Sequence, residues 1–370
     1  MAKQEKIFAV AKNPATPVDI LLALSTNKNY EIRCDVAANP STPEEILCIL
    51  AKDKDENVRR EVAMNTKLTE KIANILIESH IDIVELSLAE NPKTPIPILK
   101  KLLKDSITDV QMEIGKNPSI PLDILTKLAN SKDDSSRIGV ARNPSAPTNL
   151  LVKLAKEKDS DGIRYDLTEN PASAAEVLEI LANDSEDYIK EMAAAHPNMP
   201  IECLEKFVAQ KGDEPNLKIR AARNPSLSIK LILDLSKDKN DLVRDSIALN
   251  PSTPTEILLN LAKDKEDSVR QAVAENESAS NEINEMLAKD KDEYVRMRLA
   301  SKKSINPDIL ELLSKDKFEI VRQQVAQNIN TSKEVLTKLA EDKEIYVREN
   351  VASNPSTPEN IIRELSGFVK

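Results

Sequence analysis

Apolar and polar residues follow one another along this chain in a pattern that repeats from end to end. Between Asn39 and Asn65, a first group of apolar residues has the i, i+1, i+4, i+5 spacing of one helix face: Ile46, Leu47, Leu50 and Ala51. A polar connection follows, and a second group then shares another helix face: Val58, Val62 and Ala63. The pattern predicts two short helices of roughly ten and eight residues.

Local signals mark where these helices begin and end. Thr42 precedes Pro43, Glu44 and Glu45, which is the arrangement of a capped helix start, so we expect Thr42 to be the N-cap. Asn65 ends the second helix, and at most equivalent positions a proline follows and forbids its continuation. Helices this short are marginal in water by themselves, so stacking on neighbouring units must stabilise them.

The asparagine that ends the second helix recurs as an anchor of the pattern. His196 and Lys302 fill two of the fourteen anchor positions, and eleven of the thirteen intervals are 26 residues long. A fixed period of this length is typical of stacked units in a solenoid. We therefore expect an all-α, right-handed α-solenoid of about fourteen 26-residue two-helix repeats. It forms a single domain, 1–370, with half-repeat caps at 1–13 and 355–370.

The repeated phrase V-R-x-x-V-A-x-N-P-S-T-P-x-E-I-L-x-x-L-A-K-D resembles the leucine-rich repeat variant family. The segment from Asp53 to Arg60 is also similar to the D-x-x-x-x-V-R signature of HEAT repeats, and the architecture to armadillo arrays. The resemblance implies a stack of helix pairs, with some helices partly 3₁₀, and it covers essentially the whole chain. Some members of the variant family carry a cysteine-rich iron–sulfur segment before the repeats. This chain has none, so that cofactor is not carried over.

Composition narrows the classes of function. The net charge is −10, which does not favour nucleic acid as a partner, and there are five glycines, none spaced as in a phosphate-binding loop. No run of residues is apolar enough to span a membrane, and no apolar leader segment is evident, so we expect a cytoplasmic protein. Its three cysteines match no metal-ligand spacing, and we expect neither a metal nor a cofactor.

Catalysis is not expected from this chain. His80 and His196 are its only histidines and lie more than four repeats apart, so no nucleophile, base and orienting group can be assembled around them. His196 stands at an anchor position and should mimic asparagine at a helix end. We therefore predict that the protein is not an enzyme.

Charged residues also recur in register. Arginine lies six positions before the anchor in nine units, about 30° from the centre of the apolar arc, and aspartate lies twelve before it in eight. An arginine in that place points into the seam between units, where it can bind carboxylates and loop carbonyls. We expect this row, and the anchor asparagines, to serve structure rather than ligand binding.

Interaction residues are sought where the repeats differ on an exposed face. Positions five, four and one before the anchor should face solvent, on the concave side that binds partners in such arrays. The first of these positions is apolar in four consecutive units: Leu86, Met112, Ile138 and Tyr165. We predict that this stripe docks a protein or peptide partner, on a scaffold that is itself monomeric. The alternative is that local twist buries these side chains as packing.

Two other functions stay open at this point. A nucleic-acid-binding repeat protein would use a set of basic residues whose affinity falls with salt: Lys116, Arg142, Arg220 and Arg223. A redox or metal role would involve Cys34 and Cys48, which lie in adjacent half-units.

Overall fold

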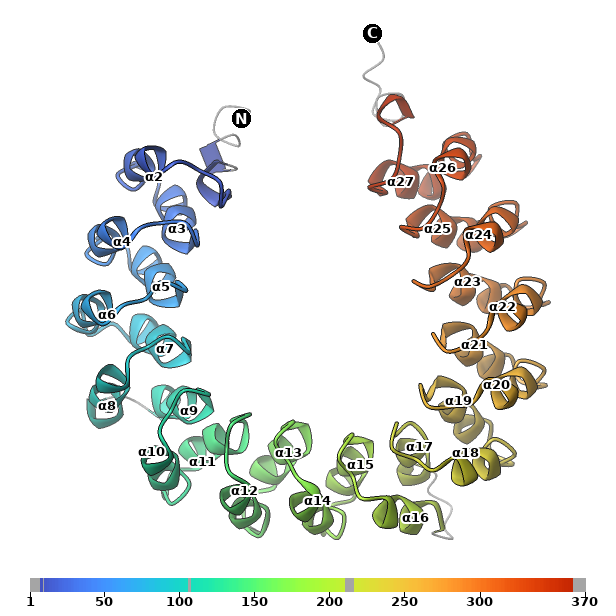
Figure 1. The fold of residues 1–370 in the computed structure, drawn as a ribbon, viewed down its shortest axis with the longest axis horizontal. Coiled ribbons are helices and arrows are strands. Elements are labelled where there is room, and N and C mark those ends of the chain that lie inside the picture. The colour runs from blue at the N-terminus through green and yellow to red at the C-terminus, as the bar shows by residue number, and fades with distance from the viewer. Residues whose placement is uncertain (1–6, 9, 106–107, 210–215, 362–370) are drawn as a thin grey trace. The chain divides into compact units, whose positions relative to one another are not determined.

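Helices are the regular elements of this protein throughout the part that the structure describes. The computed structural model describes residues 7–8, 10–105, 108–209 and 216–361, and every regular element within them is an α-helix (Figure 1). The prediction of an all-α repeat fold is confirmed. Both helices of each repeat are α-helices rather than 3₁₀. Within the described residues, no helix is both long and apolar enough to cross a membrane.

The chain divides into two compact units, Met1–Ile189 and Lys190–Lys370, and the division falls within α15 (Asp187–Ala195). In each unit, the even-numbered helices form one row and the odd-numbered helices form a second row (Figure 1). The expected caps at 1–13 and 355–370 lie partly outside the described residues. A single 1–370 domain, and the handedness of the solenoid, stay predictions.

In the first unit, the even row supplies the first helix of each repeat and the odd row the second. The even row consists of α2 (Val18–Leu24), α4 (Glu44–Leu50), α6 (Glu70–Ile77), α8 (Ile96–Asp105), α10 (Leu122–Leu128), α12 (Thr148–Ala155) and α14 (Ala175–Leu181). The odd row consists of α3 (Tyr30–Ala38), α5 (Glu56–Met64), α7 (Asp82–Glu90), α9 (Thr108–Lys116), α11 (Asp134–Ala141) and α13 (Asp161–Glu169).

The second unit continues the same alternation after α15. Its even row consists of α16 (Ile201–Ala209), α18 (Ile229–Leu235), α20 (Thr255–Leu261), α22 (Asn281–Leu287), α24 (Pro307–Leu313) and α26 (Lys333–Leu339). Its odd row consists of α17 (Asn216–Ala222), α19 (Asp241–Leu249), α21 (Asp267–Glu275), α23 (Glu293–Ser301), α25 (Glu319–Gln327) and α27 (Ile345–Ser353).

The core lies between the two rows. In the repeat used as the example, Leu47 and Leu50 of α4 and Val58 and Val62 of α5 are buried, as the sequence pattern predicts. Each helix is short, and its apolar face is covered by its partner and by the next repeat. Stability is therefore shared between neighbours along the row.

The predicted role of Thr42 is wrong. Helix α4 has Pro43 as its N-cap and receives no side-chain cap, while the hydroxyl of Thr42 donates to the carbonyl of Val36, 2.6 Å away. Thr42 is buried. The threonine therefore satisfies the end of the preceding helix, α3, rather than the start of α4. Carbonyls at the end of a helix lack partners within it, and a buried one is costly to leave short of donors. The N–H groups at the start of α4 can bind water instead.

The anchor asparagines form a continuous hydrogen-bonded ladder within each unit. The side-chain nitrogen of Asn65 donates to the carbonyls of Ala37 and Asn39 in the preceding repeat, at 2.6 and 3.2 Å. Its side-chain oxygen accepts from the backbone N–H of Lys67 at 2.8 Å. The predicted structural role is confirmed, because one buried amide satisfies groups in two repeats at once.

Two anchor positions hold a residue other than asparagine, and each residue reproduces a different part of its hydrogen bonding. The Nδ1 atom of His196 accepts from the backbone N–H of Asn198 at 3.1 Å, which reproduces the acceptor half of the asparagine pattern. Lys302 reproduces the donor half, because its ammonium donates to the carbonyl of Asn276 at 2.7 Å. Burial lowers the pKa of Lys302. This anchor is thus a charged group held in a place built for a neutral amide.

Arginine and aspartate form the second ladder, as predicted. The guanidinium of Arg270 binds both carboxylate oxygens of Asp290, at 2.7 and 3.0 Å, and donates to the carbonyl of Asp264 at 2.9 Å. The same bidentate pair recurs elsewhere: Arg33–Asp53, Arg164–Asp184, Arg244–Asp264, Arg296–Asp316 and Arg322–Asp342. These arginines are buried, so the row holds repeats together and is closed to ligands.

Candidate interaction surface

The four predicted docking residues lie at equivalent places on consecutive helices of the odd row. Leu86 is on α7, Met112 on α9, Ile138 on α11 and Tyr165 on α13, and each side chain is half-buried. Part of every side chain packs on its neighbours and part remains open to solvent. The stripe is therefore neither core nor free surface, which leaves it able to contact a partner.

The two other positions predicted to face solvent were only partly predicted correctly. Residues one position before the anchor are exposed along the stripe, as expected, but those four before it are buried: Ser87, Glu113, Gly139 and Asp166. Adjacent odd helices pack side by side more closely than the helical wheel of one repeat suggests, and these residues lie in the seam between them. The accessible surface is consequently narrower than predicted.

Among the helices of the stripe, the backbones of α9 and α11 lie closest to each other. A Cβ atom on Gly139 would lie 2.2 Å from the carbonyl oxygen of Met112, and one on Gly115 would lie 3.0 Å from the backbone of Gly139. Only glycine allows two helix backbones to come this near. Because Met112 and Ile138 belong to these two helices, the close contact sets the spacing in the middle of the stripe.

Most basic residues near this surface are paired with carboxylates. Lys116 binds Glu113 at 3.1 Å, Arg142 binds Asp166 at 2.9 Å, and in the second unit Arg223 binds Asp245 at 3.4 Å. Burial raises the pKa values of Asp166 and Asp245, and the ion pairs partly oppose this effect. Such pairing leaves little positive charge for phosphates and disfavours the nucleic-acid alternative.

Arg220, the fourth basic residue of that alternative, is exposed in the second unit. It lines a hollow of about 300 Å³ together with Arg223, Glu191, Asn216 and Ile219. A glutamate shares the hollow with the two arginines, and one of those arginines is already bound to Asp245. The hollow is therefore of mixed charge rather than a basic site.

Exposed carboxylates border the stripe along both edges. Asp82, Asp109 and Asp161 lie at the first turns of α7, α9 and α13, and Glu90 and Glu169 lie at the last turns of α7 and α13. The cations of the middle repeats, Lys116 and Arg142, are engaged in the pairs described above. The half-buried apolar stripe therefore has a border of net negative charge, in which carboxylates outnumber these two paired cations.

Sequence reasoning missed one residue at the end of the stripe. The ring of Tyr188, on α15, lies 6.3 Å from the ring of Tyr165, measured between centroids. Tyr188 is 42 % exposed. It stands eight positions before its anchor, a slot outside those predicted to face the partner. The signal available in the sequence was the placement of two of the five tyrosines in adjacent repeats.

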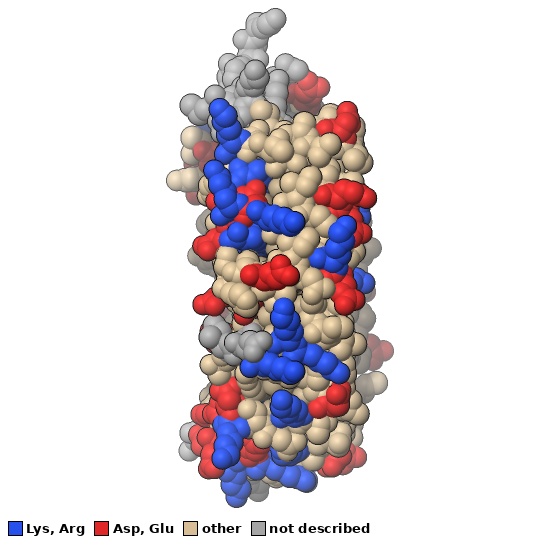
Figure 2. Space-filling model, turned by 90° about the vertical axis from the view of Figure 1, so that its left-hand side faces the viewer, with Lys and Arg blue, Asp and Glu red and all other residues tan. Residues whose placement is uncertain are grey.

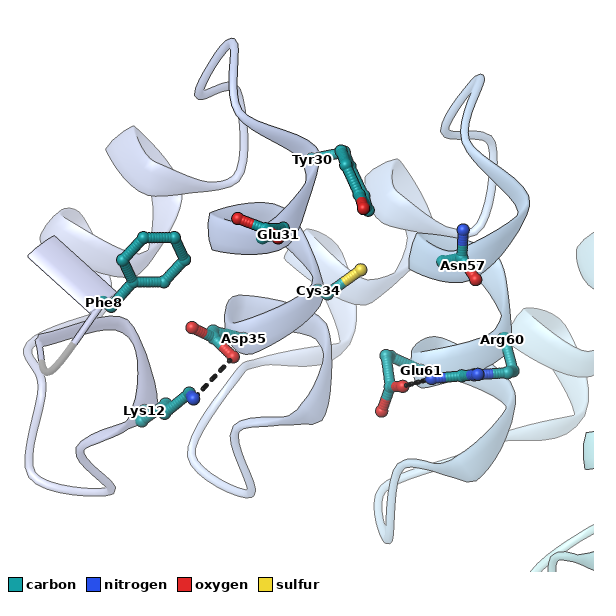
Figure 3. A pocket seen from close by; sticks show the side chains of 9 residues that line it. All are labelled: Phe8, Lys12, Tyr30, Glu31, Cys34, Asp35, Asn57, Arg60 and Glu61. Carbon is teal, nitrogen blue, oxygen red and sulfur yellow. Dashed lines mark hydrogen bonds and ion pairs between the residues drawn. The ribbon is translucent and has the colours of Figure 1, made fainter. Parts of the chain in front are cut away.

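A second hollow lies at the start of the odd row. It has a volume of about 420 Å³ and is shown in Figure 3 with the residues that line it: Phe8, Lys12, Tyr30, Glu31, Cys34, Asp35, Asn57, Arg60 and Glu61. Burial, together with the nearby carboxylates of Glu61 and Asp55, raises the pKa of Cys34 to about 11. The thiol is therefore protonated at neutral pH, which disfavours metal binding or redox reactivity.

Cys48, the other residue of that hypothesis, lies on α4 in the even row, and all three cysteines are free thiols. In the described part of the chain, no three residues of the histidine, cysteine, aspartate and glutamate types are grouped as metal ligands.

The even-numbered helices of the first unit present a different surface. Over α2, α4, α6 and α8, basic and acidic side chains are interspersed with uncharged ones (Figure 2). Three exposed lysines lie on α8: Lys100, Lys101 and Lys104. A mixture of this kind is typical of a solvated face.

Comparisons with known proteins show similarity to solved structures. No family model matches the chain, and no curated protein matches it. A solved structure described as a leucine-rich repeat variant with a novel repetitive protein structural motif is similar to it, with 23 % identity and a TM-score of 0.37. The match covers 62 % of this chain and 92 % of that one. The stacked helix pairs by themselves make the chain a helical repeat protein. Its kinship with the variant, HEAT or armadillo families stays a prediction.

Proposed function

We propose that the chain is a non-enzymatic protein-interaction scaffold that binds a protein or peptide segment on the odd row of its first unit. The contact residues are Leu86, Met112, Ile138 and Tyr165. The observation that supports this most strongly is that four consecutive helices of the odd row carry an apolar side chain in register at a slot that stays half open to solvent, whereas Arg60, Asp245 and Gln271 occupy the same half-buried slot elsewhere. A segment laid across the four apolar side chains would cover the exposed part of each.

The odd row is the side of the stack suited to such a partner. Neighbouring odd helices pack against one another more extensively than neighbouring even helices do. A row with closer spacing lies on the inner side of a curved stack, and solenoids use that side to bind extended partners. This argument favours the concave face within the first unit.

The distance between adjacent repeats matches the spacing of side chains along a helical partner segment. Adjacent packed helices are about 8–10 Å apart, and residues seven positions apart on an α-helix are separated by about 10.5 Å along its axis. Apolar side chains at i, i+7 and i+14 would therefore meet successive residues of the stripe. An ordinary β-strand would turn alternate side chains of such a set away from it.

The test is affinity capture with a double variant, Met112→Asp with Tyr165→Asp. We expect the variant to lose any partner that the wild-type protein retains from a lysate treated with nuclease, because two carboxylates would be forced against the partner's apolar side chains. The matched control is Gln271→Asp with Gln323→Asp, at the equivalent slots of the second unit. It should retain the partner.

Circular dichroism and the melting temperature must accompany the capture. If the double variant loses its helical signal, the stripe belongs to the core and the proposal is abandoned. If it stays folded and still retains every partner of the wild type, the binding surface lies elsewhere. Retention that disappears only with nuclease would favour the nucleic-acid alternative.

A further inference from the structure

The tyrosine pair at the end of the stripe is an aromatic site in a chain that is almost free of aromatic residues. Only 2 % of residues are aromatic, yet Tyr165 of α13 and Tyr188 of α15 lie with their rings 6.3 Å apart and inclined by 36°. The rings come from adjacent repeats. Both remain partly open to solvent, Tyr188 more than Tyr165.

Each tyrosine hydroxyl is fixed by a carboxylate. Tyr165 donates to Glu169, one turn along its own helix, at 3.1 Å, and Tyr188 donates across the repeats to Asp161 at 3.0 Å. The pKa of Tyr165 is raised chiefly by its hydrogen bond to Glu169, and that of Tyr188 by burial and then by its hydrogen bond to Asp161. Both hydroxyls therefore stay protonated, and two carboxylates are held at the edge of the ring pair.

Rings and carboxylates together favour a positive charge. The face of an aromatic ring attracts a cation that lies within about 6 Å of its centroid. Asp161 and Glu169 are exposed and add their negative charge at the same place. Arg164, on the same helix, is buried and bound to Asp184 at 2.6 Å, so its charge is engaged in that ion pair, and its effect on the pKa of Tyr188 is smaller than those of burial and of Asp161.

We propose that Tyr165, Tyr188, Asp161 and Glu169 form a binding site for the ammonium or guanidinium group of a lysine or arginine side chain on the partner. The inference rests on the proposed function, because Tyr165 is also the last residue of the docking stripe. It adds a polar anchor to an apolar surface. A partner segment would present apolar side chains to Leu86, Met112 and Ile138 and a basic side chain beyond them.

The acidic border of the stripe agrees with this assignment. Asp82, Asp109 and Glu90 continue the negative charge along the edges of the stripe. An incoming basic segment would be attracted by the carboxylates of α7, α9 and α13, and an acidic one would be repelled by them. The tyrosine pair is the one place on this border where rings and carboxylates occur together, among the residues that the structure describes.

The experiment is a titration of the full-length protein with small probes, followed by NMR of selectively labelled tyrosine rings. The probes are N-acetyl-lysine methylamide and N-acetyl-arginine methylamide. The control is N-acetyl-norleucine methylamide, which has an apolar side chain of similar length and no charge. We expect the charged probes to shift the ring signals of Tyr165 and Tyr188 and to bind about fourfold more tightly than the norleucine probe.

Variants separate the contributions of rings and carboxylates. Tyr188→Leu, which removes one of the two rings, should reduce the affinity for the lysine probe about twofold, and Asp161→Asn with Glu169→Gln should reduce it to the level of the norleucine probe. Tyr346→Leu is the matched control, since Tyr346 is an exposed tyrosine of the second unit, 61 % exposed, at the equivalent slot. It should leave the affinity unchanged.

Three results would overturn the inference. Equal binding of the lysine and norleucine probes would make the pair an apolar surface only, and equal shifts of all five tyrosines would mean non-specific binding. Tetramethylammonium binding ten times more tightly than the lysine probe would assign the site to a free quaternary amine. Met112→Asp separates this test from the docking proposal. It should abolish partner capture while leaving the probe titration unchanged.

Discussion

The helices α19–α27 and the helices α7–α11 build the same repeat by different means. In the former, four consecutive arginine–aspartate pairs cross the seams, from Arg244–Asp264 to Arg322–Asp342. In α7–α11, the position six residues before the anchor is Glu85 and then Gln111, and arginine occurs there again only at Arg137. There the glycines at 115 and 139 bring two backbones into contact instead.

This difference shows how a repeat can lose its polar bonds and remain stacked. Two hydrogen bonds from arginine to aspartate form an ion pair that spans the seam and holds adjacent repeats, and a further bond fixes the guanidinium to a carbonyl of its own repeat. Glycines allow the helices themselves to pack, so that dispersion contacts replace those bonds. The change coincides with the apolar stripe, because Met112 and Ile138 stand on the closely packed helices. Departure from the ladder therefore marks the part of the chain that we assign to binding.

Acid should produce the largest difference in stability between the two regions, because it protonates every aspartate of the arginine–aspartate ladder at once. The carboxyls of Asp264, Asp290, Asp316 and Asp342 are partly buried, and burial alone would raise their pKa. Hydrogen bonds from arginine and from the backbone outweigh burial and lower it. Their stabilisation is complete above the unfolded pKa, near 3.8, and is lost as the pH falls below it.

Burial raises the pKa of Asp166 beside the stripe, so its protonation has the opposite sign and favours the folded state as the pH falls. Hydrogen exchange at pH 5 and pH 3, corrected for intrinsic rates, should show a larger loss of protection in α19–α25 than in α7–α11. Equal loss in both regions would contradict the contrast.

Disrupting the close contact between the backbones of α9 and α11 should have the next largest effect on stability. Gly139→Ala places a methyl group 2.2 Å from the carbonyl oxygen of Met112, so α9 and α11 must move apart. We expect unfolding to become easier by about 3 kcal/mol, measured as a shift of the urea or thermal transition. Gly162→Ala is the matched control.

Nothing lies within 4 Å of the position that a Cβ on Gly162 would occupy. That change should be neutral or slightly stabilising, because alanine favours a helix more than glycine does. Equal destabilisation by both changes would show that helix propensity, and not the backbone approach, determines the result.

Removing one arginine should have the smallest effect of the three. Arg270→Met leaves Asp290 without its bidentate partner and should cost about 2 kcal/mol of unfolding free energy. Arg59→Met should cost less than about 1 kcal/mol, because Arg59 has Ser79 in place of the aspartate and donates to the carbonyl of Asp53. Chemical denaturation of both variants measures the difference. Equal costs would mean that the carbonyl bond within the repeat, common to both arginines, provides the stability, and that the bonds to aspartate across the seam do not.

Repeat architecture could be predicted from the sequence because each residue type recurs in register. Apolar spacing located the helix pairs, and the roles of Asn65 and Arg270 followed from positions that repeat. Thr42 was misassigned because the start of α4 and the end of α3 compete for its hydroxyl, and only the packed structure shows which carbonyl is left open. Asp166 and Gly139 were predicted to face solvent because one helical wheel contains no neighbouring helix.

By itself, the sequence determined the period, the helix pairs, the buried ladders and the four residues of the stripe, because these depend on local spacing and on chemistry repeated many times. Only the tertiary structure decided how far those four side chains are buried. It also paired Arg142 with Asp166, and it brought Tyr188 to Tyr165. These features depend on distances between adjacent repeats, which arise from packing and from the close approach that glycine permits, and no spacing within one repeat encodes them.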